Sequence, residues 1–109
     1  MKQSEIKFTV TLDEKNNPVK IDWSASDNGK VSASKAVMIS LWDEQEKNTL
    51  RIDLWTKEMM VDEMKRFYHQ SLISMAETLE RATGEKEAAK SLKSFAGKFA
   101  EQLKLINKK

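Results

Sequence analysis

The spacing of the apolar residues changes once along this chain, at Val61, and this change constrains the fold more than any other feature. Before Val61, apolar residues alternate with polar ones, which is typical of strands with one solvent-facing side. After Val61, they recur every three or four residues, as on the buried face of an amphipathic helix. The sequence therefore predicts an α+β fold in which all the strands precede the helices.

These patterns predict four strands and two helices. The strands are expected at about residues 4–12, 19–24, 35–42 and 49–56, and the helices at about residues 60–82 and 85–106. Because short loops favour an antiparallel meander, we expect one four-stranded antiparallel sheet in ββββαα order, packed on one face by the two C-terminal amphipathic helices. The 109 residues suit a single domain, 1–109. Residues 24–34 are small and polar, with Asn28-Gly29 near their centre, and are predicted to form a loop long enough to permit another strand order.

The predicted core lies between one face of the sheet and one stripe of each helix. Its sheet positions are Phe8, Val10, Ile21, Trp23, Ile39, Leu41, Ile52 and Leu54. Its helix positions are Val61, Met64, Tyr68, Leu72, Met75 and Leu79 on the first helix and Ala88, Leu92, Phe95, Phe99, Leu103 and Ile106 on the second. Gly84, between the helices, suits a left-handed cap.

Residue types that carry catalysis or hold cofactors are scarce. The chain has no cysteine and one histidine, His69, which excludes thiolate chemistry and a two-histidine metal site. It contains no GxxxxGK[ST], GxGxxG or GxSxG motif. We therefore expect a protein that is not an enzyme and holds no cofactor or metal ion. His69 is expected at the surface or boundary of its helix, the alternative being a contact residue or a titrating switch.

Charge and hydropathy restrict the partners and the location. The formal net charge of +2, from 19 basic and 17 acidic residues, lacks the basic excess expected of a nucleic-acid-binding domain. No apolar run approaches the roughly 20 residues that span a bilayer, and the first residues lack the apolar segment of a signal peptide. We expect a cytoplasmic location, no nucleic-acid partner and no membrane span. A leader that had been cleaved would leave no trace in this sequence.

The second face of the last two predicted strands is unusual for a solvated sheet. If Leu41 opposes Leu50, then Ser40 opposes Arg51, and Met38 opposes Asp53. The residues that this register takes out of the core are Met38, Trp42, Arg51, Asp53 and Trp55. Tryptophan, methionine and arginine are enriched at the centres of interfaces, so these residues are predicted to bind a protein partner or a second copy of the chain. The alternative is that residues 24–34 or 57–60 cover them.

Two segments of the chain resemble the gliding-motility GldC family of Bacteroidota. They are SEIKFTVTLDEKNNPVKIDWSA (residues 4–25) and TLRIDLWTKEMMVDEMKRFYHQSLISMAETLERATGE (residues 49–85), and the resemblance covers nearly the whole chain. The most specific parts are RIDLWTK (residues 51–57) and MKRFYHQSL (residues 64–72). The resemblance implies a small soluble accessory protein of the gliding machinery and its associated secretion machinery, with no catalytic residues.

Three functions remain open on this evidence. The first is an interaction module for gliding-machinery proteins, acting through the tryptophan-bearing face and able to form a homodimer. The second is a chaperone-like binder of extended export clients, suggested by the layout of SecB, an analogy of fold alone. The third is an enzyme or small-ligand binder with a pocket between sheet and helices. Lys86, Lys90, Lys93 and Lys104 are expected to solvate the second helix, or else to meet an acidic partner or an anionic membrane.

Overall fold

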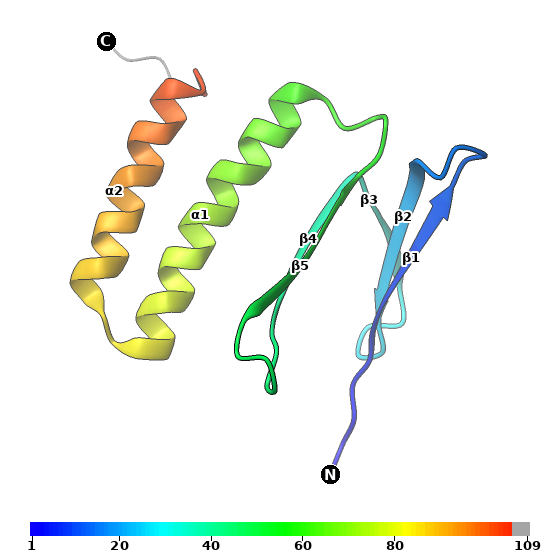
Figure 1. Ribbon diagram of the computed structural model, residues 1–109, viewed down its shortest axis with the longest axis horizontal. Coiled ribbons are helices and arrows are strands. Elements are labelled where there is room, and N and C mark those ends of the chain that lie inside the picture. The colour runs from blue at the N-terminus through cyan, green and yellow to red at the C-terminus, as the bar shows by residue number, and fades with distance from the viewer. Residues whose placement is uncertain (106–109) are drawn as a thin grey trace. The chain divides into compact units, whose positions relative to one another are not determined.

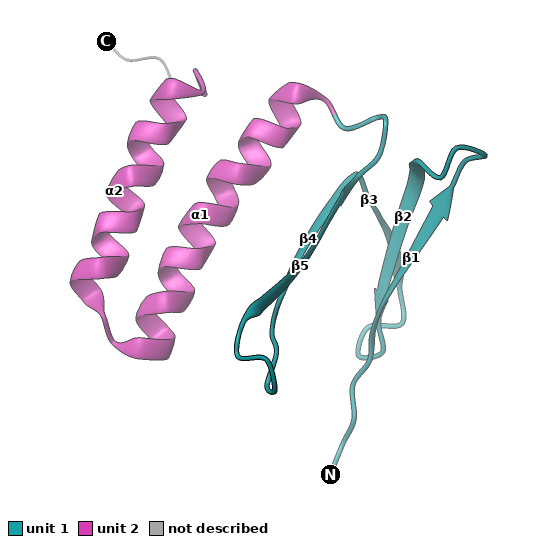
Figure 2. Cartoon of the chain, in the orientation of Figure 1, with its two compact units in different colours: residues 1–59 teal, residues 60–109 magenta. Residues whose placement is uncertain are grey.

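The computed structural model describes residues 1–105 and contains five strands followed by two helices (Figure 1). The elements are β1 (Ile6–Leu12), β2 (Pro18–Ala25), β3 (Val31–Ser34), β4 (Ala36–Trp42), β5 (Thr49–Trp55), α1 (Val61–Thr83) and α2 (Lys86–Gln102). The chain divides into two compact units, Met1–Met59 with the strands and Met60–Lys109 with the helices (Figure 2). The α+β class, with antiparallel strands and two C-terminal helices, is confirmed. That the chain is a single domain stays a prediction.

The strands form two antiparallel sheets, so the predicted single four-stranded sheet is wrong. One sheet has the order β1-β2-β3, and the other is the β4–β5 hairpin. The physical reason lies in β3, which forms within the segment predicted as a loop and pairs with β2. β3 thereby occupies the edge of β2 that a four-stranded meander would have given to β4. After β3 the chain passes through Lys35 into the separate hairpin.

The turns between strands follow from residues that tolerate left-handed backbone. In the β1–β2 turn, Asn16 has a φ of 64°, and an Asp13 carboxylate oxygen accepts the backbone N–H groups of Lys15 and Asn17, both at 2.9 Å. In the β2–β3 turn, Gly29 has a φ of 65°. The tight β2–β3 turn explains why β3 can begin so soon after β2 ends.

The best-buried part of the strand unit lies beside the bend between β3 and β4. Ile21 on β2 is 1% exposed, and Val37 and Thr56 are also buried. The backbone N–H of Thr56 donates to the carbonyl of Lys35 at 2.8 Å, which ties the end of β5 to the bend. This burial of apolar surface at the bend holds the two sheets together.

Exposure increases with distance from the bend. Val37 is buried, whereas Leu41, four residues further along β4, is half-exposed. The two sheets diverge away from the bend (Figure 1), and Phe8 on β1 is likewise half-exposed. The predicted core positions Phe8, Leu41 and Ile52 are therefore not buried within the strand unit. The cause is that a two-sheet arrangement closes at the bend and leaves the far ends of both apolar faces open.

The first helix, α1, begins and ends at recognisable caps. A Glu63 carboxylate oxygen accepts the Met60 backbone N–H at 3.0 Å, which satisfies one of the donors at the start of α1. Gly84 follows α1 in the left-handed conformation, with a φ of 75°, and its N–H donates to the carbonyl of Glu80 at 2.8 Å. The predicted left-handed cap at Gly84 is confirmed.

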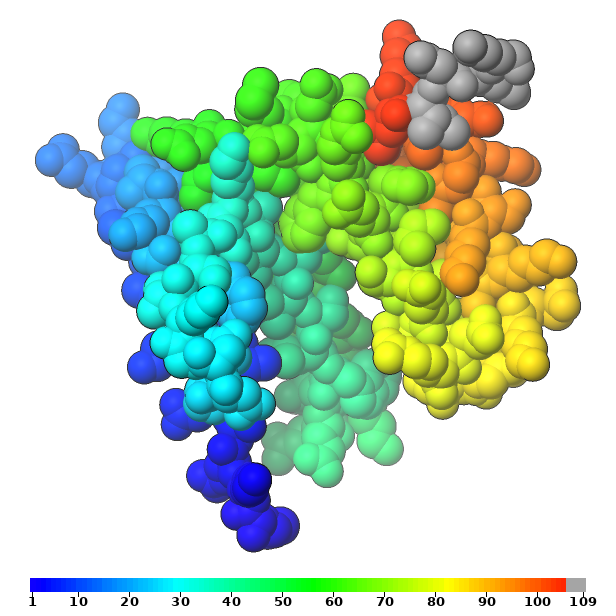
Figure 3. Space-filling view, turned by 180° about the vertical axis from the view of Figure 1, so that it is seen from behind, coloured from blue at the N-terminus to red at the C-terminus, as the bar shows by residue number. Residues whose placement is uncertain are grey.

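The two helices lie side by side (Figure 3), and the residues buried between them are alanines. The fully buried residues are Ala76 on α1 and Ala89, Ala96 and Ala100 on α2. The predicted stripes are only partly buried: Leu92 and Phe99 are half-buried, whereas Phe95 is 51% exposed. Ile106, the last residue of the predicted stripe, lies outside the described residues. That the helices pack on a sheet face concerns both units and stays a prediction.

Candidate functional site on the β4–β5 hairpin

The register of the β4–β5 hairpin is the one that the sequence predicts. Leu41 pairs with Leu50, Ser40 with Arg51, and Met38 with Asp53. Because directly opposed residues of an antiparallel pair point to the same side, the hairpin has two chemically distinct faces. We call the face that bears Met38, Trp42, Arg51, Asp53 and Trp55 the tryptophan face, and the opposite one the leucine face.

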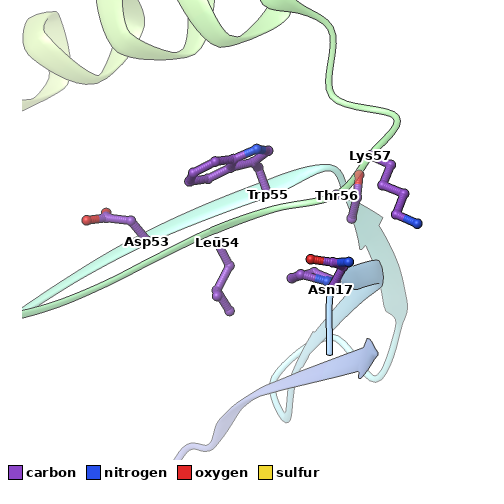
Figure 4. A pocket seen from close by; sticks show the side chains of 7 residues that line it. Asn17, Asp53, Leu54, Trp55, Thr56 and Lys57 are labelled. Carbon is purple, nitrogen blue, oxygen red and sulfur yellow. The ribbon is translucent and has the colours of Figure 1, made fainter. Parts of the chain in front are cut away.

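Figure 4 shows the two faces at the end of β5. Leu54 points to the side of β1 and β2, whereas Asp53 and Trp55 point to the opposite side. The tryptophan face therefore points away from the three-stranded sheet. This arrangement follows from the strand alternation alone, because each step along β5 turns the side chain to the other face.

Arg51 is held at the centre of the tryptophan face by three hydrogen bonds. Its Nη2 and Nε donate to the two carboxylate oxygens of Asp53, at 2.8 and 3.3 Å, and its Nη1 donates to the Ser40 hydroxyl at 2.8 Å. These bonds link Arg51 to Asp53, two residues along β5, and to Ser40, its directly opposed residue on β4. The guanidinium plane is thereby fixed on the surface before any partner arrives.

Two tryptophans stand at opposite ends of the same face. Trp42 pairs with Thr49 next to the hairpin turn, and Trp55 pairs with Ala36 next to the bend. Trp42 is 69% exposed and Trp55 is 58% exposed, so the strand unit, residues 1–59, leaves both rings largely open to solvent. Met38, between them, is half-buried. The structure therefore brings the five predicted residues to one face, with the charged pair between the two rings.

The leucine face is also open, which the sequence did not predict. Leu41, Leu50 and Ile52 lie at its far end and are between 48 and 54% exposed. Sequence reasoning assigned these residues to the core because they alternate with polar ones. The signal that could have revealed their exposure is the short, small-residue segment Val31–Ser34, which ends the first sheet at β3 and leaves the hairpin without a neighbouring strand.

A hollow of about 430 Å³ lies beside the end of β5 (Figure 4). It is lined by Asn17, Pro18, Asp53, Leu54, Trp55, Thr56 and Lys57. One wall is fixed by an ion pair of 2.8 Å between the Lys57 ammonium and the Asp13 carboxylate. The hydrogen bond from Lys57, together with the backbone N–H groups of Asn17 and Lys15, lowers the pKa of Asp13 to about 2. This hollow was not predicted, because it joins residues from distant parts of the sequence.

Residues 1–105 contain neither a metal-binding cluster of side chains nor a helix that could span a membrane. Within residues 1–105, no three histidine, cysteine, aspartate or glutamate side chains gather closely enough to hold a metal ion. In the same part of the chain, neither helix has the length and apolar composition needed to cross a bilayer. His69 is half-buried on α1.

Comparison with known proteins identifies one family. Searches of curated proteins and of solved structures gave no match. The sequence model of the gliding motility-associated protein GldC-like family matches residues 18–105, which is most of the chain and includes β2 to β5 and both helices. The chain therefore belongs to the GldC-like family of gliding motility-associated proteins.

Proposed function

We propose that this protein is a non-enzymatic accessory of bacterial gliding motility and its associated secretion machinery, and that it binds another protein of that machinery through the tryptophan face. The observation that carries the proposal is the pair of exposed rings, Trp42 and Trp55, around the hydrogen-bonded Arg51. The family supports the process, gliding motility. The expected cytoplasmic location remains part of the proposal.

The chemistry of the tryptophan face favours binding to a protein. Tryptophan and arginine are the residues most often found as energetic hot spots, where truncation of one side chain costs at least about 2 kcal/mol of binding free energy. Arg51 also loses less side-chain entropy on binding than a free arginine, because its hydrogen bonds to Asp53 and Ser40 already restrict it. A partner with a flat apolar surface and a carboxylate or carbonyl opposite Arg51 would satisfy this face.

The double variant Trp42→Ser, Trp55→Thr tests the proposal. Serine and threonine suit an exposed strand face, so the variant is expected to stay folded. It should fail to restore gliding in cells that lack the native protein, at unchanged protein abundance. It should also lose, by about 30-fold or more, affinity for the gliding-machinery protein that the native chain captures.

Leu41→Ser is the matched control, because Leu41 is the neighbour of Trp42, is similarly open, and points to the leucine face. This control should keep both the captured partner and gliding. If the double variant folds, accumulates and still supports gliding with the same partner affinity, the tryptophan face is not the binding surface.

A second candidate function, a chaperone-like binder of extended export clients, is favoured by one observation. The half-exposed leucine face lies beside strand edges that no other described strand covers, and such edges can add an extended peptide. The measurement is suppression of aggregation of an unfolded protein by the purified chain. Suppression that Leu41→Ser removes and the double tryptophan variant keeps would favour this candidate over the first.

A further inference from the structure

The sequence of β5 is complementary to itself in the antiparallel direction. Ile52 lies at its centre, Arg51 and Asp53 flank it with opposite charges, and Leu50 and Leu54 follow on either side. If a second β5 ran antiparallel to the first with the two Ile52 residues opposed, every Arg51 would face an Asp53 and every Leu50 would face a Leu54. The pairing requires charges that are opposite and equidistant from the centre, and Arg51 and Asp53 meet both conditions.

The backbone of β5 permits this pairing. The N–H of Thr56 bonds to the carbonyl of Lys35, and hydrogen-bonded pairs in an antiparallel ladder recur at every second residue. The even-numbered residues of β5 therefore bond to β4, and the odd-numbered residues direct their N–H and C=O groups to the other edge. Among the strands of residues 1–105, only β4 pairs with β5. The hollow beside Asp53 and Trp55 adjoins the C-terminal half of β5.

Charge selects one register for a second copy at this edge. The backbone allows only registers in which odd-numbered residues face odd-numbered residues. A register centred on Arg51 would oppose two guanidinium groups, and one centred on Asp53 would oppose two carboxylates. Like charges directly opposite each other destabilise a sheet, whereas the register centred on Ile52 forms two Arg51–Asp53 pairs.

We propose that two copies of this chain pair through their β5 edges, about a two-fold axis at Ile52. The two hairpins then form one continuous four-stranded antiparallel sheet. On its leucine face, Leu50 and Ile52, now 50 and 48% exposed, gain apolar neighbours from the second copy. On its tryptophan face, each Asp53 lies between the Arg51 of its own strand and the Arg51 of the second copy. The edge of β4 has no charged residue and so lacks an equivalent means of fixing a register.

The pairing does not depend on the partner surface proposed above, because its tests use the purified full chain alone. Light scattering should give the mass of a dimer at about 100 μM protein. The chain has no cysteine, so a single introduced cysteine can form a disulfide only with the same residue of a second copy. Opposed residues at the two-fold axis lie within disulfide reach, so Ile52→Cys should form a covalent dimer rapidly under mild oxidation.

Leu50→Cys is the matched control, since it lies on the same strand and face but would be about 14 Å from its counterpart. It should cross-link at least about tenfold more slowly. A monomeric mass for the native chain overturns the proposal, and so does cross-linking of Leu50→Cys as fast as that of Ile52→Cys.

Charge reversal tests the register without relying on either cysteine. Arg51→Asp and Asp53→Arg each place like charges opposite each other twice in a dimer, and each should weaken self-association by about 10- to 100-fold. An equimolar mixture of the two variants restores opposite charges at every pair and should dimerise as the native chain does. Because the mixed dimer can form only from folded chains, the mixture also controls for folding. Failure of the mixture to dimerise overturns the pairing.

Discussion

Ile21 is expected to carry more of the stability of the strand unit than any other large apolar side chain. It is 1% exposed, and it lies on the central strand β2, opposite Val10 on β1 and Ser34 on β3. Ile21→Ala removes the equivalent of about three methylene groups, which is worth about 2.4 kcal/mol at about 0.8 kcal/mol each. The cavity that remains adds to this, so we expect a loss of about 2.5–4 kcal/mol in the free energy of unfolding.

This loss is large for a unit of residues 1–59, since domains have roughly 0.05–0.15 kcal/mol of stability per residue, or about 3–9 kcal/mol here. Urea unfolding followed by tryptophan fluorescence measures it selectively, because the three tryptophans all lie in residues 1–59. Ile6→Ala is the matched control: Ile6 is 68% exposed and should contribute less than about 1 kcal/mol. Equal effects of the two substitutions, or a loss below about 1 kcal/mol for Ile21→Ala, would refute the assignment of the core to the bend.

Three further outcomes are expected. Because the folded-state pKa of Asp13 is lowered to about 2, its ion pair with Lys57 stabilises the fold above about pH 4 and loses this effect as the pH falls towards 2; Asp13→Asn should remove that part of the pH dependence of the urea midpoint. Ala96→Leu should lower the stability of the helical hairpin by about 1–3 kcal/mol through overpacking, measured by circular dichroism, whereas Lys98→Leu at an exposed position should not. His69→Ala should leave folding and gliding intact, and loss of gliding at normal abundance would contradict this.

The hairpin register could be predicted from the sequence because a single register places all the large aliphatic residues of both strands on one face and the charged residues on the other. Leu41 and Leu50 pair with each other, and shifting either strand by one residue would place Arg51 on the leucine face. The composition of the tryptophan face follows directly from that register. The exposure of a side chain cannot be predicted from the register, because exposure depends on which other elements lie above that face.

The order of the strands could not be predicted because β3 carries too little signal. Its four residues, Val31–Ser34, include one large apolar side chain, and they follow a turn signal at Asn28-Gly29 that also suits the middle of a loop. Backbone hydrogen bonds to β2 stabilise such a strand, and those bonds are independent of side-chain type. The separation into two sheets follows from this short strand.

The alanine contact between the two helices was not predicted, for a similar reason. Sequence reasoning ranks positions by the size of their apolar side chains, which placed Phe95 in the core. Two helices that approach closely accept only small residues between them, so Ala89 and Ala96 are fully buried while Phe95 lies at the surface. Phe95 instead stacks on Phe99, with ring centroids 5.6 Å apart.

Among residues 1–105, each strand pairing and the helix pairing joins elements that are neighbours along the sequence: β1 with β2, β2 with β3, β4 with β5, and α1 with α2; β2 and β5 also touch, without forming a ladder. Loop closure for each pairing therefore costs little entropy, and chains rich in such local contacts fold fast, on the order of milliseconds or less. Each hairpin can form as soon as its second strand has left the ribosome, without waiting for the rest of the chain. Once residues 1–59 are complete, β5 is also complete, so its free edge can pair with a second copy while the helices are still being synthesised.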